Sequence, residues 1–185
     1  MQEVLPMSFD EAFAVTMGHE GGYSKDPADP GGETYRGISR RFFPSWPGWT
    51  FIDKSGPGVK GLDPLVKAFY KQEFWDRFNG DALPDDIGKE LFDSAVNCGV
   101  STAAKWLQRA LNLLNRDGKD YPEVVEDGKI GPGSLRSLQA LVAMEGTAVL
   151  LKVLNIIQGE HYLSIMQKTA SQEKWARGWL KRVAI

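Results

Sequence analysis

The sequence predicts a mainly α-helical protein with seven or eight helices and at most a small β-hairpin near residues 23–38. Three features of the chain lead to this prediction. Apolar residues recur at spacings of three and four along most of the chain, as on one face of a helix. Turn-forming Gly, Pro and Asp residues cluster between these stretches. The chain has no sustained heptad and no repeat of about 20 to 50 residues, which excludes a coiled coil and a solenoid.

The first helix is expected to start at Ser8, which forms a capping box with Glu11. Its inner stripe has three apolar side chains at intervals of four and then one carboxylate: Phe9, Phe13, Met17 and Glu20. A double glycine after Glu20 gives the stop signal.

The next segments are poor in helical periodicity. Residues 23–37 hold Asp-Pro and Gly-Gly pairs, and we interpret them as an ordered loop or a small β-hairpin. Ser39 is a candidate cap for a short helix that ends before Pro44. Residues 44–61 contain three Pro, four Gly and two Trp, which predicts a long surface loop.

Six further helices are expected, each between a start signal and a turn signal. They begin near Asp63, Pro84, Ser101, Leu135, Thr147 and Ser171. The helix from Thr147 is the longest, and a second loop region covers residues 116–133.

Length and composition limit the classes of protein. The 185 residues suffice for one domain, or for one core with two lobes. We expect an N-terminal lobe over residues 1–100 and a helical C-terminal lobe over 101–185, packed as one compact unit. The net charge of −2 gives no support for a nucleic-acid partner. No apolar run approaches the roughly 20 residues of a membrane helix, so no integral membrane association is expected.

The cysteine and histidine content predicts neither a disulfide scaffold nor a zinc site. Cys98 is the single cysteine, and the chain has only two histidines. We therefore assign no metal ligands and expect no cofactor, while a carboxylate-rich magnesium or calcium site stays open at this point. The first residues lack a basic and apolar leader, so we expect synthesis in the cytoplasm without a standard secretory signal.

Glu20 is the first candidate for chemistry. It continues an apolar stripe at the end of a helix, where burial and the negative helix end both favour the protonated carboxyl. A carboxyl that keeps its proton near neutral pH is what a glycosidase uses as general acid. The alternative is a solvated carboxylate at a fraying helix end.

A glycosidase needs a second group across the sugar ring, and the polar turn after Glu20 offers several. Asp26, Asp29, Glu33 and Thr34 all lie there, and the spacing of Asp29 and Thr34 is suggestive. Ordinary turn chemistry is an equally adequate explanation of Asp26 and Asp29.

Aromatic side chains outside the helical stripes are candidates for sugar binding. Tyr23, Tyr35, Trp46 and Trp49 fall in expected loops, where rings can stack on sugar faces or cover the core. Asn97, at the end of a helix, is either a helix cap or a polar group of the binding cleft.

Three ordered motifs resemble one known family. They are Glu20-Gly21-Gly22-Tyr23 with the Asp26–Thr34 turn, then Phe92–Gly99, then Trp106-Leu107-Gln108 with Asp127–Pro132. This series resembles glycoside hydrolase family 108, lysozyme-like muramidases of phages and prophages that carry a C-terminal predicted peptidoglycan domain. The resemblance covers about residues 8 to 180 and implies a lysozyme-like fold.

The resemblance also implies a function. By similarity to phage-type lysozymes, Glu20 is the catalytic acid, and Asp29 with Thr34 orients the attacking water. The expected activity is an N-acetylmuramidase, or endolysin, that cleaves the β-1,4 bond between N-acetylmuramic acid and N-acetylglucosamine. Its expected partner is the glycan strand of peptidoglycan, reached by a monomer after holin-type release from the cytoplasm.

Two other functions stay open at this point. A lytic transglycosylase or chitinase-like enzyme would keep the fold and change the bond. A non-catalytic protein that binds the wall or assists secretion would need neither Glu20 nor Asp29.

Overall fold

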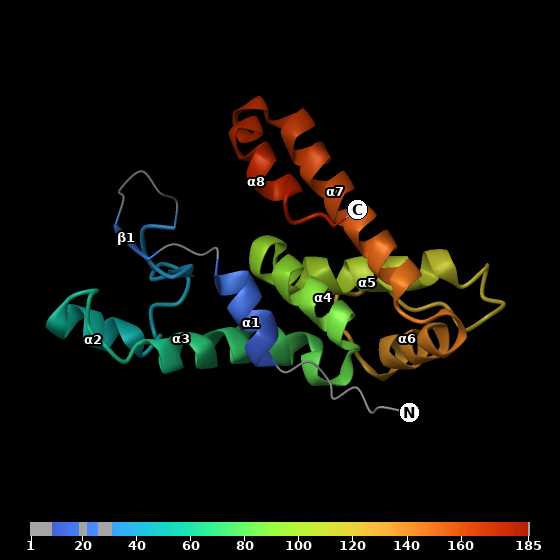
Figure 1. Ribbon diagram of the computed structural model, residues 1–185, viewed down its shortest axis with the longest axis horizontal. Coiled ribbons are helices and arrows are strands. Elements are labelled where there is room, and N and C mark those ends of the chain that lie inside the picture. The colour runs from blue at the N-terminus through green and yellow to red at the C-terminus, as the bar shows by residue number, and fades with distance from the viewer. Residues whose placement is uncertain (1–8, 19–21, 26–30, 185) are drawn as a thin grey trace.

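The computed structural model describes residues 9–18, 22–25 and 31–184. Within these residues it contains eight α-helices and a small antiparallel sheet, so the mainly α prediction is confirmed. The helices are α1 (Phe9–Met17), α2 (Gly48–Ser55), α3 (Asp63–Tyr70), α4 (Asp85–Cys98), α5 (Val100–Leu114), α6 (Pro132–Glu145), α7 (Ala148–Lys168) and α8 (Ala176–Leu180). Figure 1 shows α1 and α4 in the middle of the molecule, the sheet and α2 on one side, and α5 and α6 on the other.

The sheet contains the predicted hairpin and one additional strand. Its strands are β1 (Tyr23–Lys25), β2 (Glu33–Tyr35) and β3 (Ile38–Ser39), in the order β1-β2-β3. All neighbours are antiparallel, with Tyr23 opposite Tyr35 and Thr34 opposite Ser39. Because side chains alternate across a strand, Tyr23 and Tyr35 share one face and Thr34 lies on the other.

Between α3 and α4 the chain forms short π-helical and 3₁₀-helical turns, and the side chain of Trp75 is buried among them. A π-helical turn (Lys71–Trp75) and two 3₁₀ turns (Asp76–Phe78 and Gly80–Ala82) lead to α4. The ring of Trp75 is 1% exposed, and its Nε1 donates a hydrogen bond of 2.7 Å to Asp81. A Cβ on Gly80 would lie 2.4 Å from this ring, so the close approach requires glycine there.

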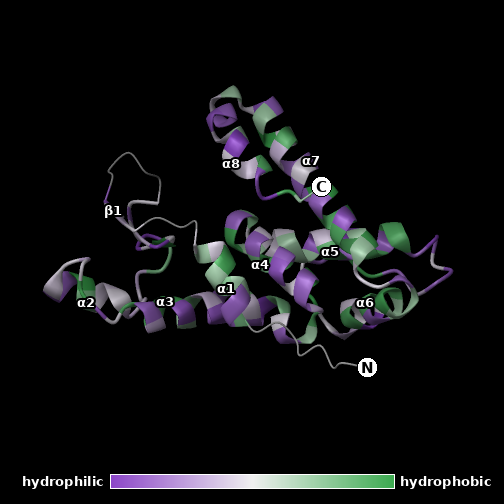
Figure 2. Cartoon of the chain, viewed as in Figure 1, coloured by the Kyte–Doolittle hydropathy of each residue, from purple (hydrophilic) through white to green (hydrophobic). Residues whose placement is uncertain are grey.

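One apolar core joins the two halves of the chain. Buried side chains of α1, α3, α4, α5, α6 and α7 form a continuous cluster that extends from Phe9 to Ile157. Figure 2 shows hydrophobic and hydrophilic residues mixed along α7, whose buried side includes Asn155 and Gln158 while Ile156 is exposed. Figure 1 shows α7 leaving the body of the molecule with α8 folded back beside it.

Two local predictions are wrong. Residues 44–61 are not one surface loop, since α2 occupies their middle and buries Trp49 and Ile52, three residues apart. The expected short helix after Ser39 is absent: Ser39 ends β3, and turns follow it. At residues 44–61 the density of Gly and Pro concealed a helix that needs only two buried side chains. At Ser39 the cap signal suggested a helix where the chain forms the end of a strand and turns.

Other boundaries differ by small amounts. The last helical region starts as a 3₁₀ turn, Ala170–Trp175, before α8. Thr147 precedes α7, but its hydroxyl donates to the Asp86 carboxylate and not to its own helix. In the described part of the chain, no helix combines the length and apolar character needed to span a membrane.

Candidate functional site

Glu20, Asp29 and the competing Asp26 lie outside the described residues. Glu20 belongs to the connection between α1 and β1, and both aspartates belong to the connection between β1 and β2. Their roles therefore stay predictions, and the described residues around them define the site.

Thr34 lies in the middle strand of the sheet and is half-buried. Its Oγ1 donates a hydrogen bond of 3.2 Å to the carbonyl oxygen of Gly32. On the same face of the sheet, Ser39 Oγ donates to the carbonyl oxygen of Gly31 at 2.6 Å. Gly31 and Gly32 directly follow the segment that contains Asp29, so the two hydroxyls are attached to the end of that connection.

The opposite face of the sheet carries a polar network centred on Glu33. Tyr23 donates its phenolic hydrogen to Glu33 over 2.9 Å, and this bond raises the pKa of Tyr23. Arg40 contacts the other oxygen of Glu33 at 3.1 Å and binds both oxygens of Asp53 at 2.7 and 2.6 Å. The same Arg40 lowers the pKa of Asp53. The network fixes the sheet against α2, and it leaves the ring of Tyr23 exposed to solvent.

The other three aromatic candidates pack against one another. Tyr35 stacks on Trp46 with a centroid distance of 5.8 Å, and Trp46 meets Trp49 edge to face at 5.1 Å. Trp46 and Trp49 are only 5% and 2% exposed, and their indole nitrogens donate to the carbonyl oxygens of Leu65 and Phe43. For these two residues the structure shows the packing alternative, because their rings offer no free face to a sugar.

Asn97 is exposed in the last turn of α4, where its Nδ2 donates to the carbonyl oxygen of Asp93 at 2.7 Å. It also lines a cleft of about 680 Å³, which we term the junction cleft. The walls of the junction cleft come from α1, α4, α7, the Ala170–Trp175 turn, α8 and the chain after α8. Asn97 thus makes a contact at the helix end and also lines this cleft, and its part in sugar binding stays a prediction.

Glu90 is the most perturbed carboxyl among the described residues and faces the junction cleft. Burial, and then the negative charge of Asp93, raise its pKa to about 7. Hydrogen bonds from Ser94 and Asn155 act in the opposite direction. Gln158 of α7 in turn donates to Ser94 Oγ at 3.2 Å, so α4 and α7 meet through polar side chains at this point.

The sequence analysis did not identify Glu90 as a candidate, because Glu90 is not part of any of the three family motifs. A usable signal was on the facing helix, where Asn155 and Gln158 interrupt an apolar stripe at a spacing of three. Buried amides at that spacing require a polar partner on the neighbouring helix.

Glu90 should make the stability of the protein depend on pH. Its pKa is about 7 in the folded protein against 4.5 ordinarily, so only the folded state holds this proton between about pH 4.5 and 7. The contribution of Glu90 to the free energy of unfolding is therefore fully present below about pH 4.5 and is lost as the pH rises toward 7. Glu90→Gln should remove this loss, so that its free energy of unfolding falls less than that of the wild type between pH 5 and 8. The expected difference is on the order of 3 kcal/mol.

Urea unfolding at pH 5 and pH 8 measures this difference. Glu123→Gln, at an exposed position after α5, controls for the removal of one negative charge. Equal pH dependence in wild type and Glu90→Gln would contradict the assignment.

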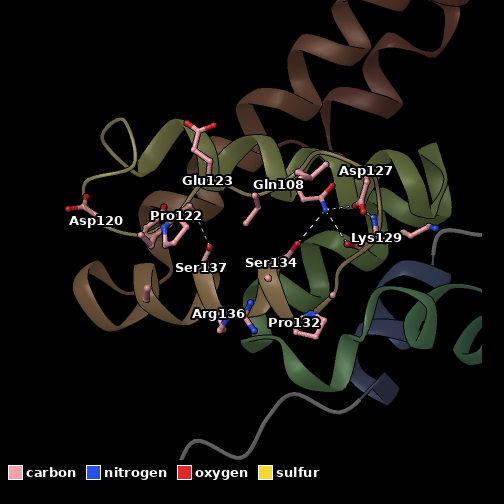
Figure 3. Close-up of a pocket in the computed structure, with 16 residues that line it drawn as sticks. Gln108, Asp120, Pro122, Glu123, Asp127, Lys129, Pro132, Ser134, Arg136 and Ser137 are labelled. Atoms are coloured by element: carbon pink, nitrogen blue, oxygen red, sulfur yellow. Dashed lines mark hydrogen bonds between the residues drawn. The ribbon is translucent and has the colours of Figure 1, made fainter.

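A separate pocket of about 670 Å³ lies between α5, the segment 120–131 and α6 (Figure 3). The buried amide of Gln108 organises it, as the dashed lines of Figure 3 show. Gln108 Nε2 donates to Asp127 Oδ1 at 2.9 Å, to the Lys129 carbonyl oxygen at 3.1 Å and to Ser134 Oγ at 3.3 Å. The Asp127–Pro132 stretch is thus a loop held on α5 that leads into α6.

Metal ligands are not gathered anywhere in the described residues. No group of three or more His, Cys, Asp or Glu side chains there is arranged to hold a metal ion.

Comparison with known proteins divides the chain into two segments. Residues 13–99 match the family described as Glycosyl hydrolase 108, and residues 102–184 match the Predicted Peptidoglycan domain. The solved structure of Brucella abortus SagA is similar, with a TM-score of 0.64 and 23% sequence identity over 95% of this chain and 88% of that one. This likeness shows a shared, lysozyme-like fold. A search of curated proteins gives no match.

Proposed function

We propose that the chain is an N-acetylmuramidase, because residues 13–99 match the glycosyl hydrolase 108 family and residues 102–184 match a predicted peptidoglycan domain. The two matches together support a peptidoglycan hydrolase. The specific bond in this proposal is the β-1,4 linkage between N-acetylmuramic acid and N-acetylglucosamine.

In this proposal Glu20 protonates the oxygen of the leaving sugar. A proton given to that oxygen compensates the charge that develops as the glycosidic bond breaks. Asp29 and Thr34 orient the water that attacks the sugar carbon or stabilise the oxocarbenium-like state. Of these three, the described Thr34 already has its hydroxyl at the end of the connection that contains Asp29.

The observation that carries the proposal is the extent of the family segment. Residues 13–99 include Glu20, Asp29 and Thr34, the whole sheet and the end of α1.

Release of reducing sugar ends from purified peptidoglycan tests the proposal. A muramidase should generate reducing ends and disperse the wall without added cofactor. Anhydro-muramic ends in place of reducing ends would indicate a lytic transglycosylase, and tight wall binding with no released ends would indicate a non-catalytic protein. Either result would overturn the proposal.

We also propose where the enzyme meets its substrate. Peptidoglycan lies outside the cytoplasmic membrane, so a cytoplasmic pool must be released before it acts. A phage or prophage lysis setting with a holin-type membrane lesion fits this requirement, and the protein would act as a monomer.

A further inference from the structure

The junction cleft has a wall from each of the two matched segments. Thr16 and Asn97 come from residues 13–99, and Trp175, Trp179 and Arg182 come from residues 102–184. Thr16 lies in the last turn of α1 and precedes Glu20 by four positions in the sequence. The cleft therefore extends to the last turn of α1.

We propose that the junction cleft binds acetamido sugars of the glycan strand, with Trp175 and Trp179 as stacking platforms. This inference rests on the proposed function, since it names the surface that holds the strand beside the proposed acid. It assigns the C-terminal segment a direct part in holding the strand at the cleft.

Trp175 and Trp179 are more accessible than Trp46 and Trp49, and Lys174 Nζ lies 5.1 Å from the centroid of the Trp175 ring. Trp175 is 53% exposed, although an indole ring is usually buried in a protein of this size. Trp179 is half-buried. One face of its ring stacks on the buried Tyr162, with a centroid distance of 5.3 Å and an interplanar angle of 20°. Flat apolar rings with a polar edge suit a sugar ring, which has apolar faces and polar edges.

The polar groups of the cleft suit a ligand rich in amides and hydroxyls. Two carboxylates (Asp86, Asp93) and three basic side chains (Lys89, Lys181, Arg182) line it, together with the Glu90 carboxyl, whose pKa is raised to about 7. The amides of Asn97 and Asn155 line the cleft as well. Pockets of 300 to 1,000 Å³ commonly enclose ligands of this kind, and the junction cleft of about 680 Å³ lies within that range.

The cleft is also a fixed structure, since its two walls are tied together. Arg182 Nη1 binds Asp93 Oδ1 at 2.6 Å, and both side chains are about one-fifth exposed. The backbone N–H of Ala184 donates to Asn155 Oδ1 at 2.6 Å. The chain after α8 is thereby attached to α4 and α7, and the tryptophans before it keep their place relative to α1. A wall that is already in position loses little entropy when a sugar binds.

Calorimetric binding to the full-length Glu20→Gln protein tests the inference without hydrolysis. The probes are the N-acetylglucosamine hexamer and peptide-free glycan strands, which share acetamido sugars, together with intact peptidoglycan. Adding Trp175→Ala should weaken the binding of the hexamer and of the peptide-free strands about 3- to 10-fold. Phe51→Ala, which removes a half-exposed ring from α2, is the matched control and should leave the dissociation constant unchanged.

The outcomes separate this inference from the proposed function. A dissociation constant that Trp175→Ala leaves unchanged for both peptide-free probes overturns the inference, even if the wild type cleaves peptidoglycan. Binding of intact peptidoglycan alone, insensitive to Trp175→Ala, also overturns it and indicates recognition of the peptide stems. Weakened binding in Trp175→Ala, with no cleavage by the wild type, supports the cleft and contradicts the muramidase.

Discussion

Glu20→Gln should lower the turnover of peptidoglycan by about 10²- to 10⁴-fold, the usual contribution of a general acid. The amide keeps the shape of the side chain and cannot supply a proton to the leaving oxygen. Because the substitution preserves hydrogen bonding to the sugar, the Michaelis constant should change much less than the turnover number. Initial rates of reducing-end release at several substrate concentrations measure both quantities.

Glu11→Gln is the matched control for this experiment. Glu11 is exposed in the first turn of α1, so its replacement removes a carboxylate nine positions before Glu20 in the sequence. It should retain the wild-type rate. Wild-type turnover in Glu20→Gln would remove Glu20 from the mechanism, whereas an equal loss in both variants would indicate a general effect of charge on α1.

Trp75→Ala should have the largest effect on stability, about 3–5 kcal/mol of the free energy of unfolding. The centroid of the Trp75 ring lies within 6.0 Å of the ring centroids of Phe9, Phe78 and Phe92, and the ring packs directly on Gly80. Its removal leaves a cavity at the meeting point of α1, the turns after α3, and α4. It also removes the hydrogen bond to Asp81, which contributes to the lowered pKa of that carboxyl. Urea unfolding followed by circular dichroism gives the free energy directly.

Trp175→Ala is the control for size and chemistry, since it removes the same side chain from a position that is 53% exposed. Its expected cost is below about 1 kcal/mol, in the range of ordinary surface substitutions. A loss below about 1 kcal/mol in Trp75→Ala would show that this ring does not organise the core.

The helices were predictable where a long apolar stripe repeats. Residues 85–98 and 100–114 fold as the spacing of their apolar side chains indicates, because a stripe of several turns outweighs local turn propensity. In α2 the stripe is only Trp49 and Ile52, so the surrounding Gly and Pro residues determined the prediction and concealed the helix. The stacking of Tyr35 on Trp46 depends on residues 11 positions apart, and no local pattern reports such a contact.

The sequence could predict which residues of the family motif are candidates for chemistry, but it could not predict the cleft that tertiary packing forms. The residues that carry the family motif lie close in sequence, and a motif of this kind is visible without a fold. The junction cleft joins α1 and α4 to residues 175–184, and its key charge pair spans 89 positions. Only tertiary packing brings these residues together, which explains why Glu90 and Arg182 were not among the predicted site residues.

Digestion of peptidoglycan in ¹⁸O-labelled water, followed by mass spectrometry of the products, tests the muramidase most directly. The account predicts one ¹⁸O atom at the reducing carbon of N-acetylmuramic acid in each new chain end. Label on N-acetylglucosamine instead, or unlabelled anhydro-muramic ends, would contradict it.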